Sequence, residues 1–452
     1  MTLLNELSAE VCQRARMSRD PRFDGRFFVA VKTTGIFCRP ICPANLPKEE
    51  NVEYFSSQAL AVSAGYRPCL RCRPESTPHS WAWKGAETTF LRALTLIEQG
   101  DLDGSLETLA SRLGISDRYL RQLFQRHLGM PPKQYAQIQQ LMFAKQLLHT
   151  SQISITEVAY ASGFQSTRRF NDAFQKLFRL TPTQVRRERA ALPSRNHLSL
   201  AFRGPFDWAH MLDFYRLRAI EGMELVDEQS YQRHFVLGEG TGWFKASMAQ
   251  SHLDIEFEME RLSDLRHLVA RLRRMFDLDA DLISIEAHLE QLAPGLVRRT
   301  GIRIPGVWNA WEAGVRAVLG QQVSVKAAIG QLNLLVSTLA ASEGSTRYFP
   351  TPEQVQMSDL SFLRMPERRK ETLKRLADYV RLHPMDSPMA WLSLSGIGPW
   401  TVDYAQLRGE SRSHCFLTGD LIVKKALAKF PHLTAESVAP WGSYATFHCW
   451  SH

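Results

Sequence analysis

The chain has 452 residues, of which 44% are hydrophobic and 22% are charged. This composition excludes a disordered chain, and the length is enough for about three domains that each bury a core. Lys and Arg number 55 and Asp and Glu 46, which gives a formal net charge of +9. Residues 112–187 alone hold twelve basic and three acidic residues, so this segment accounts for the whole excess. Such focused positive charge favours a localised anionic partner.

The sequence also indicates the compartment. No run of about eighteen apolar residues occurs, which excludes a membrane span. The first twenty residues mix charges of both signs, which disfavours a secretory signal. The seven cysteines are odd in number and unevenly clustered, unlike those of a secreted disulfide framework. We therefore expect a cytoplasmic, nucleoid-associated protein in a reducing environment.

Four of the cysteines form two close pairs near the N-terminus. Three residues separate Cys38 from Cys42, two separate Cys69 from Cys72, and 26 lie between the pairs. Paired thiols on tight turns suit tetrahedral Zn²⁺, because each local loop supplies two ligands. We therefore predict one zinc ion held by four thiolates. Unrelated buried thiols or a redox pair are the alternative interpretation.

A zinc site with four thiolates carries a net negative formal charge, which leaves its sulfurs electron-rich. Such a thiolate can attack an alkyl group on a neutral phosphotriester, whereas an ordinary DNA phosphate repels it. Methyl transfer would then reduce the negative charge of the site and raise its affinity for DNA. From the residues alone, a purely structural zinc site stays open as the alternative.

Three motifs accompany the cysteine pairs. Residues 19–25 read RDPRFDG, residues 33–40 read TTGIFCRP and residues 65–72 read GYRPCLRC. Together they closely resemble the N-terminal domain of the Ada adaptive-response family. The resemblance implies a small α+β zinc domain over residues 1–76, in which Cys38 accepts the methyl group of a DNA methylphosphotriester. The O6-alkylguanine methyltransferase module that usually follows has no counterpart in this sequence.

Residues 80–190 carry helical patterns throughout and contain a weak internal repeat. The segment 109–114 matches the segment 158–163 at an offset of 49 residues, and each copy precedes a second helix that bears arginines. We therefore predict two tandem helix-turn-helix units. The side chains expected to reach DNA are Arg118, Arg121, Gln122, Arg168 and Arg169. A solvated charged face is the alternative for any single arginine. The segment resembles AraC-type regulators, which implies a transcriptional activator that binds promoter DNA and RNA polymerase.

Between residues 195 and 285 the hydrophobic pattern changes to alternation, as in residues 197–202 and 253–258. Alternation with a period of two is typical of half-buried strands, so we predict a domain with a sheet there. From about Pro305 the chain again reads as helical and stays so to its end.

The helical C-terminal part contains a glycine hairpin followed by an aspartate. Gly396 and Gly398 flank one apolar residue and could let backbone N–H groups approach a DNA phosphate. An ordinary turn between helices is the alternative. About twenty residues later Asp420 opens an apparent helix, where capping that helix is its other expected role. Trp400 and Tyr404 lie one helical turn apart, and a core position is the alternative for both. This order is the helix-hairpin-helix pattern of base-excision glycosylases.

Within that superfamily, residues 198–450 most resemble the AlkA-type 3-methyladenine DNA glycosylases. Two of the matching motifs are GVRAVLGQQVS at 314–324 and WGSYA at 441–445. The resemblance implies that Asp420 is the catalytic carboxylate and that Gln322 stands at the position of the wedge that fills the gap left by the flipped base. The aromatic pocket residues that it implies are Trp400, Tyr404 and Trp450.

Departures from the superfamily also predict chemistry. Trp400 stands where lyase-type relatives place a lysine nucleophile, so we expect base removal without strand cleavage. Only Cys415 and Cys449 remain in this half, so no iron–sulfur cluster is expected. Gln322 replaces the apolar wedge of some relatives, and could fill the same space with hydrogen bonds.

The sequence thus predicts a multidomain protein. Its parts are a small α+β zinc domain (1–76), an all-α tandem helix-turn-helix domain (80–190), an α+β antiparallel-sheet domain (195–285) and an all-α helix-hairpin-helix glycosylase domain (286–452). The predicted function is excision of alkylated bases from double-stranded DNA by a monofunctional 3-methyladenine glycosylase, fused to a methyl-activated transcriptional regulator. The alternative is a regulator with structural zinc and a glycosylase-like half that binds DNA without catalysis.

Overall fold

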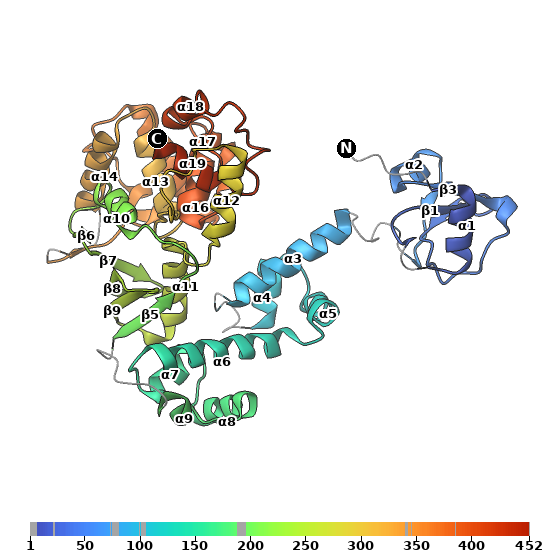
Figure 1. Ribbon diagram of the computed structural model, residues 1–452, viewed down its shortest axis with the longest axis horizontal. Helices are drawn as coiled ribbons and strands as arrows, with labels where there is room; N and C mark the ends of the chain where they lie inside the picture. Colours follow the sequence, from blue (N-terminus) through green and yellow to red (C-terminus); the bar gives the residue numbers. More distant parts are fainter. Residues whose placement is uncertain are drawn as a thin grey trace. The chain divides into compact units, whose positions relative to one another are not determined.

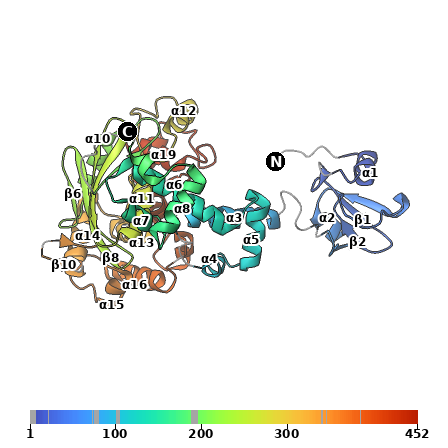
Figure 2. The ribbon, with the colours of Figure 1, turned by 90° about the horizontal axis from the view of Figure 1, so that it is seen from below.

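Figures 1 and 2 show the computed structural model of the chain, coloured along the sequence. It describes residues 7–20, 23–72, 74, 81–98, 100, 105–187, 196–339, 342–344, 346–384 and 386–451. The chain folds as two compact units, Met1–Gln139 and Gln140–His452.

The N-terminal unit begins with a small four-stranded sheet. Its strand order is β3-β1-β2-β4, with β1 antiparallel to both neighbours and β2 parallel to β4. The strands are β1 (Phe28–Val31), β2 (Ile36–Cys38), β3 (Val52–Phe55) and β4 (Arg67–Pro68). The helical segments of this part are α1 (Ala9–Met17), the 3-10 turn η2 (Glu49–Asn51) and α2 (Gln58–Ser63).

Strand β1 contributes to two apolar clusters, because successive side chains of a strand point to opposite faces of the sheet. Val29 packs in one cluster with Cys12 of α1. Ala30 packs in the other with Phe37 of β2 and Ala61 of α2. Both clusters are small, which leaves this part of the chain with little apolar core of its own.

The first helix-turn-helix follows in the same compact unit, and its last helix, α6, continues into the C-terminal unit. Its helices are α3 (Trp81–Glu98), α4 (Leu106–Arg112), α5 (Asp117–Leu128) and α6 (Pro132–Thr150). The Ser116 hydroxyl caps α5 by accepting the N–H of Tyr119, and Gly129 ends the helix with a φ of +69°. Phe124 is fully buried, with its ring 5.2 Å from that of Phe90, so it is a core residue of this unit.

The second helix-turn-helix lies in the C-terminal unit and is built in the same way. Its helices are α7 (Ile155–Ala161), α8 (Thr167–Phe178) and α9 (Pro182–Arg187). Ser154 and Glu157 form a capping box at the start of α7. Phe170 and Phe174 of α8 are fully buried core residues, as Phe124 is in α5, so the sequence repeat corresponds to a structural one.

A five-stranded antiparallel sheet comes next, with the strand order β5-β9-β8-β7-β6 (Figure 1). Its strands are β5 (His197–Ala201), β6 (Glu224–Val226), β7 (Ser230–Leu237), β8 (Gly240–Met248) and β9 (His252–Met259). The helices of this part are α10 (Trp208–Arg216), the 3-10 turn η4 (Leu262–Asp264) and α11 (Leu265–Met275). Along β9, Leu253, Ile255 and Phe257 are buried while Glu256 is exposed. The predicted alternation is therefore confirmed in β5 and β9.

The remaining chain is mainly helical. Its helices are α12 (Leu282–Leu292), α13 (Ala310–Gly320), α14 (Val325–Leu339), α15 (Pro352–Met357), α16 (Glu367–Leu382), the 3-10 helix η5 (Pro388–Ser393), α17 (Pro399–Glu410), α18 (Leu421–Leu427) and α19 (Gly442–Trp450). A short hairpin of β10 (Ser342–Glu343) and β11 (Thr346–Arg347) departs from the expectation that this part is helical throughout. Gly344, with a φ of +63°, provides its turn.

Helix α13 is almost entirely buried, including Glu312 and Arg316. Helix α17 crosses it closely because Gly409 has no side chain: a Cβ there would lie 2.5 Å from the Cα of Ala310. The predicted fold class is confirmed, whereas the four domain boundaries stay a prediction. None of the helices in the described part of the chain is long and apolar enough to cross a membrane.

Candidate functional sites

The four cysteines of the two predicted pairs converge at one end of the small sheet. Cys38 ends β2, and the parallel pairing of β2 with β4 brings Cys69 beside it. The N–H of Cys69 donates to the carbonyl of Phe37 at 3.0 Å. The sulfurs of Cys38, Cys42, Cys69 and Cys72 all lie within 4.8 Å of one another. This spacing fits tetrahedral coordination with Zn–S bonds of about 2.3 Å.

The electrostatics of this cluster also favour a cation. A hydrogen bond with Cys72 and burial raise the pKa of Cys38, and burial raises the pKa of Cys42. The same hydrogen bond lowers the pKa of Cys72 to about 6. Four thiols held this close resist ionising together, and a divalent cation removes that penalty. Arg39 fixes the loop between the first two ligands, because its N–H donates to Cys72 Sγ at 3.4 Å and its guanidinium pairs with Asp24.

The predicted DNA-reading side chains lie on exposed faces of α5 and α8. Arg118, Arg121 and Gln122 are exposed on α5, and Arg168 and Arg169 are exposed in the first turn of α8. Arg121 also pairs with Asp117, one turn earlier, at 2.7 Å. All five predicted side chains are therefore accessible to a DNA duplex.

The glycine hairpin joins η5 to α17. Gly396 has a φ of +94°, and a Cβ there would meet Thr372 Oγ1 at 2.1 Å, so only glycine fits. Gly398 has a φ of −112° and open space around its Cα, so of these two glycines Gly396 alone adopts a positive φ. The side-chain amide of Gln321 donates to the carbonyl of Gly396 at 3.1 Å and to Thr401 Oγ1 at 3.2 Å. These two bonds hold the hairpin on the end of α13.

Asp420 is the N-cap of α18, as one of its two expected roles requires. Its Oδ1 accepts hydrogen bonds from the N–H of Ile422 at 2.9 Å and the N–H of Val423 at 3.2 Å. The same oxygen accepts the indole N–H of Trp450 at 3.1 Å. Oδ2 has no hydrogen-bond partner among the described residues. The cap thus holds the carboxylate rigidly and leaves one oxygen available to a substrate.

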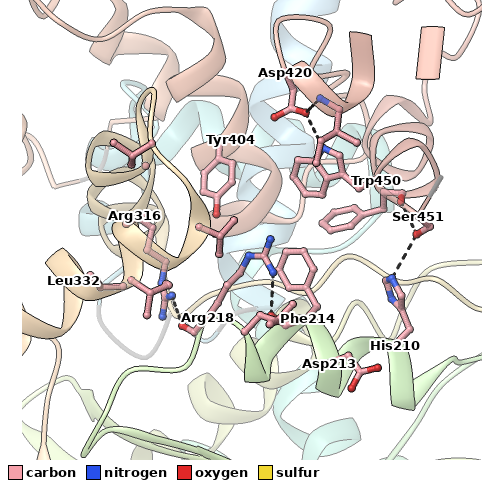
Figure 3. A pocket seen from close by; sticks show the side chains of 18 of the residues that line it. His210, Asp213, Phe214, Arg218, Arg316, Leu332, Tyr404, Asp420, Trp450 and Ser451 are labelled. Atoms are coloured by element: carbon pink, nitrogen blue, oxygen red, sulfur yellow. Dashed lines mark hydrogen bonds between the residues drawn. The ribbon is translucent and has the colours of Figure 1, made fainter. Parts of the chain in front are cut away.

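Asp420 lines a pocket of about 500 Å³ together with Trp400, Tyr404 and Trp450. Trp400 and Tyr404 are stacked along α17, with ring centroids 5.3 Å apart and planes inclined by 26°. Figure 3 shows Tyr404 and Trp450 on opposite sides of the pocket, with Asp420 at one end. The rings are half-buried. The structure therefore brings together the predicted carboxylate and all three predicted aromatic residues.

Gln322 lies outside this pocket lining, in the turn between α13 and α14. It is exposed and has a φ of +57°, a conformation that side chains other than glycine rarely adopt. Its neighbour Val323 is exposed and lines the pocket. Backbone strain of this kind clusters at functional turns, and the wedge role of Gln322 stays a prediction.

One wall of the pocket, formed by α10 and the turn after it, was not predicted from the sequence. Phe214 and Arg218 both line the pocket, and the guanidinium carbon of Arg218 lies 3.7 Å from the ring centroid of Phe214. The two residues are four positions apart, the spacing at which side chains meet on a helix. That spacing was a signal available in the sequence.

A buried ion-pair cluster supports the pocket from behind. Arg316 of α13 pairs with Glu312 at 2.9 Å and with Glu224 of β6 at 3.2 Å. Arg233 of β7 pairs with Glu224 at 2.8 Å and with Glu312 at 2.5 Å. Although burial opposes it, attraction to the two guanidinium groups lowers the pKa of Glu312 to about 2. Because Arg316 lines the pocket and donates to the Arg218 carbonyl at 3.0 Å, the cluster joins the sheet to the pocket wall.

Comparison with known families matches three parts of the chain. Residues 11–75 match the metal binding domain of Ada, residues 109–188 match a helix-turn-helix domain, and residues 197–309 match the AlkA N-terminal domain. The first match spans all four clustered cysteines. Together with their geometry, it confirms the predicted zinc site.

One relative matches almost the whole chain. It is a protein of Mycobacterium tuberculosis (strain CDC 1551 / Oshkosh) described as a probable bifunctional transcriptional activator/DNA repair enzyme AlkA, 34% identical over 98% of this chain and 96% of its own length. The chain belongs to this bifunctional AlkA family. Two relatives from Escherichia coli (strain K12) match separate parts of the bifunctional chain. DNA-3-methyladenine glycosylase 2 is 33% identical over 56% of this chain and 96% of its own. The bifunctional transcriptional activator/DNA repair enzyme Ada is 34% identical over 38% of this chain and 47% of its own.

Proposed function

We propose that this bifunctional AlkA protein excises alkylated bases from double-stranded DNA with Asp420 as the catalytic carboxylate, and that it senses DNA methylphosphotriesters with Cys38. The coarser assignment, a DNA-repair glycosylase fused to a methyl-sensing transcriptional regulator, follows from its family and from relatives named for those activities. The observation that carries the residue-level proposal is the Asp420 carboxylate, which three donors hold by one oxygen at an aromatic pocket.

Excision begins when the damaged nucleotide flips out of the duplex into the pocket. A purine alkylated at N3 or N7 is already cationic, so Trp400, Tyr404 and Trp450 can hold it by stacking and cation–π attraction. When the N-glycosidic bond breaks, its electron pair goes to the base and positive charge develops on the sugar, which the Asp420 carboxylate stabilises. Water then adds to the sugar C1′, and its proton passes to Asp420 or to solvent. With Trp400 in place of a lysine nucleophile, the strand stays intact.

Replacing the carboxylate by an amide tests this role. Asp420→Asn keeps an oxygen that can cap α18, and it should lower the rate of 3-methyladenine excision from duplex DNA by on the order of 100-fold or more. Asp213→Asn is the matched control: Asp213 lines the same pocket, but its carboxylate is exposed and pairs with Arg216, so the rate should not change. Equal rates for Asp420→Asn and the unmodified protein would reject the catalytic role and favour a half that only binds DNA.

The duplex is proposed to be held at further points. Backbone N–H groups at Gly396 and Gly398 approach a phosphate at the start of α17, and Gln322 fills the space that the flipped base leaves. The exposed side chains of α5 and α8 bind promoter DNA; they are Arg118, Arg121, Gln122, Arg168 and Arg169. An activator bound in this way contacts RNA polymerase and associates with the nucleoid.

The promoter contacts are testable by their dependence on salt. Replacing Arg168 or Arg169 by Ala should weaken binding to all sequences and flatten the salt dependence of the affinity if the side chain contacts phosphate. Replacing Gln122 by Ala should relax sequence preference if it reads a base edge. Unchanged footprints for all three variants would remove α5 and α8 from the DNA interface.

Methyl sensing is assigned to the zinc site. Bound zinc keeps the four sulfurs ionised at neutral pH. Cys38 Sγ then attacks the methyl carbon of a DNA methylphosphotriester, the carbon–oxygen bond breaks, and an ordinary phosphodiester leaves. Conversion of one thiolate to a thioether removes one negative charge from the site, so affinity for DNA rises. Cys38, Cys69 and Cys72 are half-buried whereas Cys42 is buried, so exposure disfavours Cys42 as the acceptor, and the choice of Cys38 rests on its match to the Ada motif.

Mass spectrometry of proteolytic peptides decides between transfer and a structural zinc site. After exposure to DNA that carries methylphosphotriesters, the peptide with Cys38 should gain one methyl group. The peptide with Cys12, a buried cysteine outside the zinc site, is the internal control and should gain none. No methyl group on any zinc-site cysteine would establish a structural role and would leave the glycosylase proposal untouched.

A further inference from the structure

One wall of the base pocket carries an arginine without a carboxylate partner. Arg218 lines the pocket and lies over Phe214, with its guanidinium carbon 3.7 Å from the ring centroid. One of its N–H groups donates to the Phe214 carbonyl at 3.2 Å. Within the described residues no ion pair joins Arg218 to an acidic side chain. Burial lowers its pKa to about 10, so Arg218 is still a cation at neutral pH.

The neighbouring arginines already form ion pairs with carboxylates or hydrogen bonds within the protein. The lining holds two other arginines. Arg316 is buried and paired with both Glu224 and Glu312, and Arg299 is paired with Asp207 at 2.6 Å. Arg408 lies 4.6 Å from the Phe214 ring, but it is fully buried and donates to the Tyr404 hydroxyl at 3.1 Å and to the Pro305 carbonyl. Arg218 is therefore the arginine of this group that can offer N–H groups to a base in the pocket.

The pocket is polarised as a result. Figure 3 shows Asp420 at one end and Arg218 at the other, with Tyr404 and Trp450 between them. A sugar beside Asp420 would direct its base past the aromatic rings toward Arg218. The negative end of the pocket then faces the sugar, and the positive end faces the base.

We infer that Arg218 determines how the pocket treats uncharged bases relative to cationic ones, an inference that rests on the proposed glycosylase function. A cationic alkylpurine leaves as a neutral base, so a guanidinium group gives its departure no help and repels its bound form. An uncharged purine receives the electron pair of the broken N-glycosidic bond and leaves as an anion. Hydrogen bonds from Arg218 to a ring nitrogen or carbonyl oxygen stabilise that anion. Water adds to C1′, the base takes a proton from solvent, and Arg218 keeps its own.

The test compares two bases in the full-length protein under single-turnover conditions. Hypoxanthine is the uncharged probe and 3-methyladenine the cationic one, each in duplex DNA. Arg218→Met keeps an unbranched side chain over Phe214 but removes the charge and the donors. It should lower hypoxanthine excision by about tenfold or more, the value of a hydrogen bond from a charged donor. Excision of 3-methyladenine should be unchanged or faster.

Two further variants separate charge from packing. Arg218→Lys restores a cation without the planar fork and should recover part of the hypoxanthine rate. Arg381→Met is the control, because Arg381 is exposed, lies outside the pocket lining and pairs with Asp378; it should leave both rates unchanged.

The outcomes test the role of Arg218 separately from the proposed glycosylase function. A selective loss of hypoxanthine excision supports the role of Arg218. An equal loss on both bases, no loss on either, or failure of the unmodified protein to excise hypoxanthine while it excises 3-methyladenine overturns the inference alone. Failure of the unmodified protein to excise either base overturns the proposed glycosylase function as well.

Discussion

The zinc site and the pocket lined by Asp420 bring their side chains together by different means. All four zinc ligands lie between Cys38 and Cys72, on loops that one pair of strands brings together. The pocket instead draws on residues from His210 to Ser451, which meet only when several helices have packed. The spacing of residues in the sequence can predict a site made of neighbouring loops. A site made of distant helices forms only when the core has folded.

The two regions also differ in what stabilises them. Two small apolar clusters support the sheet beside the zinc site, whereas large clusters run through α13, α17 and α19 around the pocket. Small domains with so little apolar core commonly need a metal ion to fold. We therefore expect the folding of the zinc region to depend on bound zinc, and the folding of the helices around the pocket not to depend on it.

Removing zinc with a chelator should cause the largest loss of stability, and that loss should be confined to the zinc region. Zinc binding contributes about 10–16 kcal/mol in small zinc domains, far more than two small clusters can supply. Strands β1 to β4 should lose protection from hydrogen exchange. The protection of α13 and α17 should not change, and neither should the rate of 3-methyladenine excision. Loss of protection in α13 as well would show that the two regions are not independent.

Removing one charge from the buried cluster should be the next largest effect, now on the pocket side. Glu312→Gln leaves Arg233 and Arg316 short of a counter-charge, and the free energy of unfolding should fall by about 3–5 kcal/mol. Glu371→Gln is the matched control, because Glu371 forms an exposed pair with Arg375 at 2.8 Å and should cost about 1 kcal/mol or less. Urea denaturation measures both. Equal costs would contradict the idea that buried ion pairs support the pocket.

Asp277 should make the stability of the C-terminal unit, which holds the pocket, depend on pH. Burial raises its pKa from 3.8 to about 7, and its carboxyl group is hydrogen-bonded to the Tyr444 hydroxyl and the Ile304 N–H. A raised pKa means that the stabilisation is complete below pH 3.8 and is lost as the pH rises to about 7. At about 1.4 kcal/mol for each pKa unit, the loss is on the order of 4 kcal/mol.

Asp277→Asn should flatten this dependence, which melting temperatures across that pH range would measure. Asp378→Asn is the control, since Asp378 lies away from Asp277 in the sequence and forms a solvent-accessible pair with Arg381, and it should leave the slope as it is. A slope that survives Asp277→Asn would assign the pH dependence to another group.

The smallest expected effect belongs to a local feature of the pocket side, the glycine hairpin. Gly396→Ala forces a Cβ against Thr372 at a positive φ, and strain of this kind typically costs about 1–3 kcal/mol. The value of kcat/KM for excision should fall by about tenfold. Gly398→Ala has the space and the φ that alanine needs and should keep the free energy of unfolding of the unmodified protein. Equal losses for both variants would mean that Gly398 has a constraint of its own.

What could be predicted from the sequence follows the same division. The spacing of Cys38, Cys42, Cys69 and Cys72 reports the geometry of tight turns directly, so the zinc ligands were identified as a set. Asp420 was identifiable because an N-cap is also a local pattern. The hydrophobic alternation of β5 and β9 was readable for the same reason, since strand periodicity extends over only a few residues.

The rest required the folded chain. Arg233 and Glu312 are far apart in the sequence, and their pairing exists only because β7 and α13 pack together. Nothing in the spacing around Arg218 indicates that it lacks a carboxylate partner, because that depends on every element packed around it. The positive φ of Gln322 is likewise a property of the turn between two packed helices and not of its residue type.

The two carboxylate oxygens of Asp420 differ in their hydrogen bonding. Oδ1 accepts hydrogen bonds from two backbone N–H groups and an indole N–H, and Oδ2 accepts none within the described chain. A descendant that gave up repair but kept its architecture would therefore be free to change this position only to a residue that still caps, such as asparagine or serine. Under the proposed catalytic role, position 420 becomes a diagnostic character: aspartate would mark relatives that excise damaged bases, and a neutral capping residue would mark relatives that retain regulation alone.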